Sequence, residues 1–357
     1  MESSVLIVKG IFKRVFLTKK LLDIKVVEEV KNILDKKMKP VESLGRLEKI
    51  AIQIAGITGK TENSISKKLH LVASADNGVI EEGVSSCPLE YTRLVSEAML
   101  SKVAAIGILC DTLDIDFKLV DIGINGNIER NYPNLYRKKI RNGTKNFVYE
   151  PAMTYEECIA AIEVGISIVE ENLEYDIFSN GEMGIGNTTT SSAILYAFTN
   201  GDLDVIVGRG GGLDDRGLAK KKQVIADAVS KYNLIDAAPT EILRCVGGLD
   251  IACMVGFYLG CAANRKPILI DGFISSVAAL VAQKIDKNTS DYMIATHRSE
   301  EPGMKILTEI LDKQPFLDMN MRLGEGTGAV LAHPIVLSAL EVAKRMKTPR
   351  EVYEILG

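Results

Sequence analysis

The stretch DIFSNGEMGIGNTTT, residues 176–190, joins a short β-rich run to a glycine-rich turn and the start of a helix. Gly184 and Gly186 permit a tight turn with exposed backbone N–H groups, and the following helix adds its N-terminal dipole. The hydroxyl groups of Thr188 and Thr189 supply further donors. These features predict a phosphate-binding turn, with a plain glycine turn and helix cap as the alternative. A Walker loop is excluded because no Gly-Lys-Ser or Gly-Lys-Thr follows.

Outward from this stretch, short β-rich runs alternate with longer helical runs. The β-rich runs cover residues 69–75, 117–123, 176–181, 267–272 and 292–297. The helical runs cover residues 95–109, 156–173, 191–198, 222–232, 249–263 and 274–284. This alternation predicts an α/β fold with a mostly parallel sheet. Each β-rich run ends in polar or glycine-rich sequence. Because ligands bind at the carboxyl ends of parallel strands, we expect one shared cleft.

The composition is that of a globular protein without a strong electrostatic preference. The 357 residues contain 43 Lys and Arg against 47 Asp and Glu, a net charge of −4, which argues against nucleic acid or an anionic membrane as a partner. No run approaches the roughly 18 apolar residues of a membrane span, and the N-terminus lacks the apolar core of a signal peptide. We therefore expect a soluble, cytoplasmic protein of about two domains.

The cysteines and histidines do not form a metal-binding pattern. The six cysteines include no C-x-x-C pair, and His70, His297 and His333 lack ligand spacing. We therefore expect no metal and no cofactor, and most cysteines are expected to be small core residues. Cys87 lies in a loop-like stretch and is a candidate pocket residue.

A second glycine-rich stretch, VGRGGGLDDRGLAKKK at residues 207–222, is a candidate ligand-closing loop. Three consecutive glycines and two aspartates do not form a packed element, so a flexible loop is expected there. The basic helix that follows carries Lys220, Lys221 and Lys222, one of which is expected to reach a phosphate. The alternative is a solvated loop beside a basic helix face.

The third stretch, RLGEGTGAVL at residues 322–331, places Glu325 between two glycines. Its apolar neighbourhood predicts a carboxyl group whose pKa is raised by desolvation, which suits a general base near neutral pH. A solvent-facing loop residue is one alternative. The other is a relaxed dinucleotide fingerprint, Gly324-x-Gly326-x-x-Ala329, which would indicate a nucleotide-binding oxidoreductase and requires a preceding strand.

Taken together, these motifs resemble the nicotinate-nucleotide:dimethylbenzimidazole phosphoribosyltransferase family, which activates the lower ligand of cobamides. From residue 43 onward the chain carries, in the family's order, ADNGV, EGVSSCP, GEMGIGNTT, GRGGGLDDRGLAKK, VGGLDIA, DGFISS, HRSEEPG and RLGEGTGA. The resemblance implies a doubly wound, mostly parallel α/β domain at residues 66–333. It also implies a small helical domain built from residues 1–65 plus 334–357, and a homodimer.

The implied reaction moves phosphoribose from nicotinate mononucleotide to a lower-ligand base such as 5,6-dimethylbenzimidazole. It proceeds with inversion and yields α-ribazole 5'-phosphate and nicotinate. Glu325 matches the family's catalytic base. The residues implied to bind the nucleotide and its phosphate are Glu182, Gly184, Gly186, Asn187, Thr188, Gly210, Lys221 and Ser299.

The acceptor base is implied to bind on the other side of the cleft. The residues implied for this pocket are Cys87, Tyr91, Val95, Met99 and Leu323. Helical spacing puts Tyr91, Val95 and Met99 on one face, for which plain core packing is the alternative. His297, which begins the HRSEEPG loop, is expected at the same cleft.

Three positions depart from the common family pattern. Asn77, Cys87 and Arg216 stand where many members have a histidine, a tyrosine and an acid. The departures near residues 77–95 leave the acceptor open among benzimidazoles, adenine-like bases and phenols. For a phenol, Glu325 would deprotonate the hydroxyl group. A subunit that works only in a heterodimer with a paralogue, and activates a phenolic or purine base, is the alternative to a homodimeric enzyme.

Overall fold

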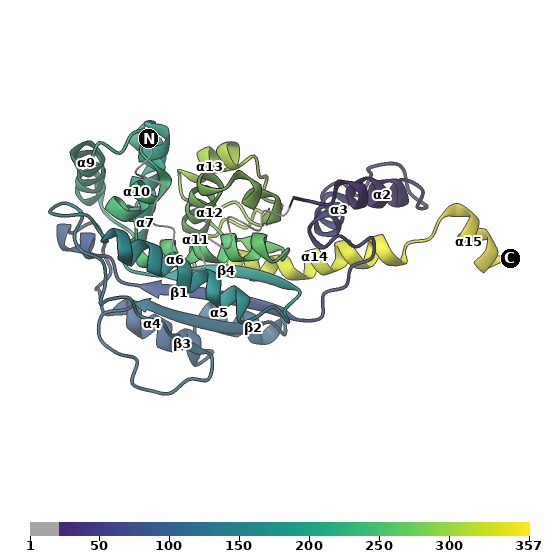
Figure 1. Ribbon diagram of the computed structural model, residues 1–357, viewed down its shortest axis with the longest axis horizontal. Coiled ribbons are helices and arrows are strands. Elements are labelled where there is room, and N and C mark those ends of the chain that lie inside the picture. The colour runs from purple at the N-terminus through teal and green to yellow at the C-terminus, as the bar shows by residue number, and fades with distance from the viewer. Residues whose placement is uncertain (1–20) are drawn as a thin grey trace.

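The computed structural model describes residues 21–357, and a six-stranded sheet lies at its centre (Figure 1). The strand order is β3-β2-β1-β4-β5-β6, and all neighbouring strands are parallel. The strands are β1 (Lys68–Ala75), β2 (Asp116–Gly123), β3 (Leu135–Arg137), β4 (Ile177–Met183), β5 (Ile268–Ile270) and β6 (Met293–Ala295). The chain winds outward in both directions from β1 and β4, so the predicted doubly wound α/β fold is confirmed.

Helices cover both faces of the sheet. One layer contains α4 (Tyr91–Leu100), α5 (Ala105–Thr112) and α14 (Thr327–Arg345). The other contains α6 (Tyr155–Glu170), α11 (Leu249–Ala263) and α12 (Phe273–Ile285). Packed outside the second layer are α7 (Asn187–Thr199), α8 (Leu203–Ile206), α9 (Asp215–Lys231), α10 (Pro239–Val246) and α13 (Met304–Leu311). Two short 3-10 helices span Gly78–Glu82 and Lys287–Tyr292.

Strand β1 is buried on both faces. Leu71 and Ala73 belong to the large apolar cluster under α6 and α11, whereas Val72 belongs to the cluster under α4 and α5. Strands that are covered on both sides have no solvent-facing side, so apolar residues stand on both faces of β1 and its polar residues His70 and Ser74 are buried as well.

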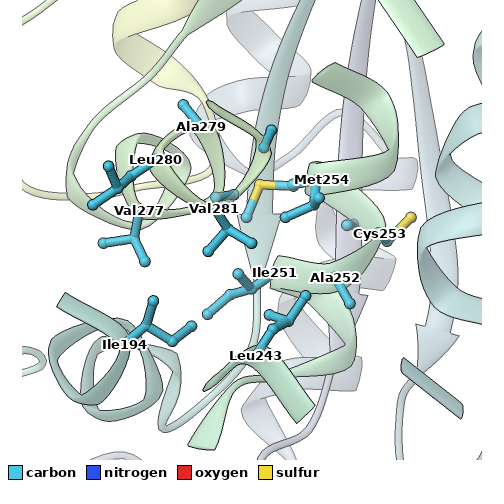
Figure 2. Packing of buried hydrophobic residues seen from close by; sticks show 14 of the residues in the cluster. Ile194, Leu243, Ile251, Ala252, Cys253, Met254, Val277, Ala279, Leu280 and Val281 are labelled. Carbon is cyan, nitrogen blue, oxygen red and sulfur yellow. The ribbon is translucent and has the colours of Figure 1, made fainter. Parts of the chain in front are cut away.

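Helix α11 is the central element of the larger layer, and every residue from Leu249 to Cys261 is buried. Its backbone lies against that of α6, because a Cβ atom on Gly256 would come within 2.1 Å of the carbonyl oxygen of Ile162. Figure 2 shows side chains of α7, α10, α11 and α12, among them Ile251 and Val281, converging in one apolar cluster. The helical run predicted at 249–263 is confirmed, and its apolar residues on all sides fit a helix that is buried on most faces.

Two elements differ from expectation. The run 95–109, expected as one helix, is divided into α4 and α5 by residues 101–104, where Lys102 has a φ of 58°. The α5 backbone turns back over the end of α4, and a Cβ on Gly107 would lie 2.6 Å from the carbonyl oxygen of Met99. Strand β3 was not expected, because three residues at a sheet edge leave too short a pattern.

The helices from the two chain ends lie side by side. Helix α3 (Arg46–Thr58) packs on α14, and α2 (Ile24–Asp35) packs on α3. Figure 1 shows α14 running from the sheet past α2 and α3, with α15 (Pro349–Leu356) beyond them. Helix α14 therefore crosses the expected boundary between residues 333 and 334 without a break. The division into 1–65 plus 334–357 and 66–333 stays a prediction, and its residues 1–20 lie outside the described part of the chain.

Within residues 21–357, α14 is the one helix long and apolar enough to be tested as a membrane span. Half of its 18-residue window is buried inside the protein, and it packs on α3, α5, β4 and β5. A core helix passes the same test, so this finding is weak evidence for a span.

Five of the six cysteines are buried, which confirms their prediction as core residues. They are Cys110, Cys158, Cys245, Cys253 and Cys261, whereas Cys87 is half-buried in the loop after β1. All six are free thiols.

Candidate active site

A cavity of about 370 Å³ lies beyond the carboxyl ends of the strands near the point where the strand order reverses between β1 and β4. Doubly wound sheets bind ligands at this position. The walls come from the loop after β1, the β4–α7 turn, the loop around Gly210, the β5–α12 turn, the segment after β6 and the loop before α14.

One expected contributor to the cleft is missing. The carboxyl end of β2 and the residues that follow it, 121–126, do not line the cavity. Its polar groups are used locally instead, because the backbone N–H of Ile124 donates to Asp121 and that of Asn125 donates to Asp76. That part of the sequence-based expectation is therefore wrong.

Most predicted site residues lie on this one cavity. The lining residues from the predicted nucleotide set are Glu182, Gly184, Gly186, Asn187, Thr188, Gly210 and Ser299. Those from the predicted base set are Cys87, Tyr91, Val95 and Leu323. Glu325 and His297 line it as well.

Met99 does not line the cavity. It is completely buried in the apolar cluster with Leu100 and Ile106, because α5 covers the last turn of α4. The predicted base-pocket role of Met99 is therefore wrong, and the core alternative holds for this one member of the α4 stripe.

Glu325 lies in the loop before α14, and its buried carboxylate sits at the N-terminal end of α5. Only 8% of the residue is exposed, and the backbone N–H of Ile106, in the first turn of α5, donates to its Oε2 at 3.3 Å. Burial raises the pKa of the Glu325 carboxyl group, and the Ile106 N–H partly opposes this rise. The group therefore combines raised basicity with an anchored oxygen, and the solvent-facing alternative is wrong.

The backbone at Glu325 is left-handed, with a φ of 64°. A non-glycine residue in this region is strained by roughly 1–3 kcal/mol and persists only where the surroundings hold it. Gly326 follows with a φ of 90°, and a Cβ there would lie 2.1 Å from Cε1 of His70. The glycine after Glu325 thus lets the loop lie directly on an imidazole ring.

Glu182, at the end of β4, belongs to a buried acidic network. Asn187 Nδ2 donates both to Glu182 Oε2 and, at 3.1 Å, to Asp250 Oδ2. Burial and the neighbouring Asp250 raise the pKa of Glu182 to about 8, and burial raises the pKa of Asp250 to about 7. Protonated carboxyl groups at neutral pH can donate as well as accept hydrogen bonds, which suits contacts to hydroxyl groups.

Lys221 is completely buried behind the cavity wall, although its neighbours on α9 are not. Its Nζ donates to Thr188 Oγ1 and to the carbonyl oxygen of Gly208, each at 3.0 Å. Burial lowers the pKa of the Lys221 ammonium group to about 8. This cation therefore lies next to the N-terminus of α7, where backbone N–H groups already favour an anion.

Three charged lining residues, Asp271, Glu301 and Arg322, have no role in the sequence-based prediction. Asp271 follows β5, and its Oδ1 accepts the backbone N–H of Ala329 at 3.1 Å and lies 3.5 Å from His297 Nδ1. Burial raises the pKa of Asp271, and His297 opposes the rise. The signal that could have identified Asp271 is its place at a strand end in DGF. Glu301 lies in the HRSEEPG stretch after the last strand, whereas Arg322 carries no strand-end signal.

The departures from the family pattern lie at the edge of the site or away from it. Asn77 is buried beneath the β4–α7 turn, where its Nδ2 donates to the carbonyl oxygen of Ile185, and it does not line the cavity. Arg216 is exposed on α9. Cys87 alone lines the cavity, beside Tyr91.

One chemical alternative loses its basis. Residues 318–324, before the Gly324 fingerprint, form no strand, so the dinucleotide-binding interpretation and the oxidoreductase it implied are wrong. Among residues 21–357, no group of His, Cys, Asp and Glu side chains has the arrangement of a metal site.

Comparisons with known proteins agree over nearly the whole chain. A family model described as Phosphoribosyltransferase matches residues 20–352. A nicotinate-nucleotide--dimethylbenzimidazole phosphoribosyltransferase of Clostridium tetani is 43% identical over 333 residues, which cover 92% of this chain and 91% of the relative. An enzyme of the same name from Ruminiclostridium cellulolyticum is 42% identical over 329 residues, covering 92% and 93%. The crystal structure of CobT from Thermus thermophilus superimposes with a TM-score of 0.88 at 34% identity, covering 92% and 98%.

Proposed function

The chain belongs to the nicotinate-nucleotide–dimethylbenzimidazole phosphoribosyltransferase family, and from that premise we propose how its cavity carries out the transfer. The enzyme transfers phosphoribose from nicotinate mononucleotide to a lower-ligand base of cobamides. The observation that carries the proposed mechanism is the place of Glu325, a buried carboxylate on the wall of a cavity that also presents the N-terminus of α7 and apolar side chains.

Glu325 acts as the general base. One nitrogen of the neutral benzimidazole attacks the anomeric carbon while its other nitrogen carries a proton. As the new C–N bond forms, the bond to nicotinate breaks and its electron pair returns to the pyridine nitrogen. The proton of the attacking base becomes acidic and passes to Glu325, whose raised pKa suits this transfer near neutral pH. The leaving pyridinium needs no general acid, and attack from the opposite face inverts the anomeric carbon.

The phosphate of the nucleotide binds at the α7 N-terminus. Lys221 Nζ, the Thr188 hydroxyl group and the glycines of the β4–α7 turn supply positive charge and donors there. Glu182, protonated at neutral pH because of its pKa of about 8, meets the ribose hydroxyl groups. Holding the two rings in line provides most of the acceleration, since general base catalysis contributes roughly 10²–10⁴-fold.

The acceptor base binds against Cys87, Tyr91, Val95 and Leu323. We expect Val95→Phe to change the ranking of acceptors, because a larger side chain on α4 shortens the apolar side of the cavity. The affinity for nicotinate mononucleotide should change less. Turnover with a panel of benzimidazoles, purines and phenols, each at saturating nucleotide, measures this ranking.

The matched control for Val95→Phe is Val103→Phe, at a residue that is 70% exposed and does not line the cavity. It should leave the ranking unchanged. An unaltered ranking in Val95→Phe would remove Val95 from the base pocket. The same panel, run on the unmodified enzyme, identifies which of 5,6-dimethylbenzimidazole, purines and phenols is the preferred acceptor.

We further propose that the enzyme works in the cytoplasm as a homodimer. The chain expressed alone is expected to elute at twice its 38.9 kDa mass in size-exclusion chromatography and to turn over without a second protein. The heterodimer with a paralogue has no observation in its favour. It would be supported if the isolated chain were inactive and regained turnover on mixing with a paralogous subunit.

A further inference from the structure

Three buried side chains form a hydrogen-bonded chain beneath the loop of Glu325. His70 of β1, Ser179 of β4 and His333 of α14 are each at most 1% exposed, and none of them lines the cavity. His70 Nδ1 lies 2.8 Å from Ser179 Oγ, and His333 Nε2 lies 3.0 Å from the same oxygen. The other ring nitrogen of His70, Nε2, lies 3.0 Å from the backbone carbonyl oxygen of Glu325.

The direction of every bond in this chain follows from one fact: a carbonyl oxygen only accepts. His70 Nε2 must therefore carry the proton and donate to Glu325. In a neutral imidazole the other nitrogen, Nδ1, is then an acceptor, so the Ser179 hydroxyl donates to it. With its proton used, Ser179 Oγ accepts from His333 Nε2. The chain thus runs from His333 through Ser179 and His70 to the Glu325 carbonyl.

Both imidazoles stay neutral at working pH. Burial lowers the pKa of His70 to about 4 and that of His333 to about 3. The tautomer of His70 therefore follows from the Glu325 carbonyl, is compatible with Ser179 as a donor to Nδ1, and does not change through protonation near neutral pH.

The hydrogen bond from His70 is made to the backbone carbonyl of Glu325, and the orientation of this peptide sets the direction of the Glu325 side chain. The residue has a left-handed φ of 64°, which its surroundings must hold. The loop also presses on the imidazole, since a Cβ on Gly326 would overlap the ring. Turning the Glu325 peptide would move its carboxylate away from the Ile106 N–H and from the cavity wall.

We propose that His70 is a positioning residue, whose Nε2–H holds the Glu325 carbonyl and so directs the Glu325 carboxylate at the acceptor base. Ser179 and His333 keep His70 in the donating tautomer. This inference rests on the proposed role of Glu325 as the general base.

Two substitutions of His70 distinguish the role of Nε2 from that of Nδ1. The amide nitrogen of Gln in His70→Gln reaches the place of Nε2 and can still donate to the Glu325 carbonyl. The shorter amide in His70→Asn reaches only the place of Nδ1 and keeps contact with Ser179 alone. We expect kcat to stay within about 5-fold of wild type in His70→Gln and to fall roughly 10- to 100-fold in His70→Asn. The KM for nicotinate mononucleotide should change less than about 2-fold in both, because neither touches the nucleotide.

A double-mutant cycle with Glu325→Gln tests whether His70 acts through Glu325. If it does, His70→Asn should lower kcat by less than about 2-fold in the Glu325→Gln background, because the carboxylate it positions is already gone. A merely structural defect would lower kcat by the same factor in both backgrounds and would follow the melting temperature. Should His70→Asn fail to fold, Ser179→Ala in the same cycle removes the donor to Nδ1 and tests the same tautomer.

The outcomes separate this inference from the function it rests on. Wild-type kcat in Glu325→Gln would overturn the general base and this inference together. An inactive Glu325→Gln beside a fully active His70→Asn would overturn the inference and leave the base in place. Equal losses in His70→Gln and His70→Asn, or losses that multiply in the cycle, would also overturn it. A loss confined to His70→Asn and absent from the Glu325→Gln background supports it.

Discussion

Glu325→Gln is expected to lower the turnover number at least roughly 100-fold, while the dissociation constant for nicotinate mononucleotide stays within about 2-fold of wild type. The amide keeps the size of the side chain and can still accept the Ile106 N–H, but it cannot take up the proton of the attacking base. Rates of α-ribazole 5'-phosphate formation at saturating substrates, together with calorimetric titration of the nucleotide, measure the two quantities.

The matched control is Glu300→Gln, which alters an exposed carboxylate on the neighbouring loop and should leave both quantities unchanged. Turnover near the wild-type rate in Glu325→Gln would remove Glu325 as the base. The pH profile gives an independent check. In the wild type, kcat should fall on the acid side at a pH above the ordinary glutamate range, because burial raises the pKa of the group that must be ionised. This acid limb should be absent from the residual activity of the variant.

The thermal stability of Glu325→Gln is expected to stay equal to that of the wild type or to rise, although its turnover falls. A carboxyl group whose pKa is raised in the folded state binds more protons folded than unfolded. Its ionisation therefore destabilises the fold as the pH rises from the unfolded pKa past the raised folded one. Glu325→Gln removes this cost at neutral pH. A melting temperature at or above that of the wild type, together with a large loss of turnover, would show that Glu325 serves catalysis and does not stabilise the fold.

Lys221→Met is expected to weaken nicotinate mononucleotide binding by roughly 10- to 100-fold, with a smaller effect on kcat at saturation. The substitution removes the buried ammonium group that faces Thr188 and the Gly210 loop, and it replaces the long side chain with an apolar one of similar length. Because burial already lowers the pKa of this lysine to about 8, the fold should tolerate the loss of the charge.

The pH dependence of binding follows from the same group. Below about pH 8 the free enzyme holds Lys221 protonated and attracts the phosphate, and above it the charge is lost. The kcat/KM for nicotinate mononucleotide should therefore fall as the pH rises through about 8 in the wild type, but not in Lys221→Met. Lys220→Met, at an exposed neighbour on α9, is the control and should behave as wild type. Unchanged nucleotide affinity in Lys221→Met would place the phosphate elsewhere in the cavity.

Local pattern is enough to predict much of the fold. The β-rich run at 69–75 predicts β1 to within one residue, since a strand buried on both faces carries apolar residues on both of them. The run 95–109 predicts one helix, although the chain breaks at residues 101–104. That break depends on α5 packing against the end of α4, which no local periodicity records.

Some residues of the site could likewise be predicted from local sequence, whereas others depend on tertiary packing. The glycines around Glu325 and in the β4–α7 turn indicate ligand loops, because a glycine-rich loop departs from any helix or strand pattern. Sequence reasoning overlooks Asp271 and wrongly assigns Met99 to the pocket, because burial and side-chain direction depend on the neighbouring elements.

The sequence by itself therefore determined the strand–helix alternation, the family and the carboxylate proposed as the base, since each is written in residues that are close together in the chain. Only the tertiary structure decided how that carboxylate is held. Its oxygen is anchored by Ile106, 219 positions away, and its carbonyl by His70, 255 positions away. Such contacts are brought about by the order of the strands in the sheet, and that order depends on packing across the whole molecule rather than on any local run of residues.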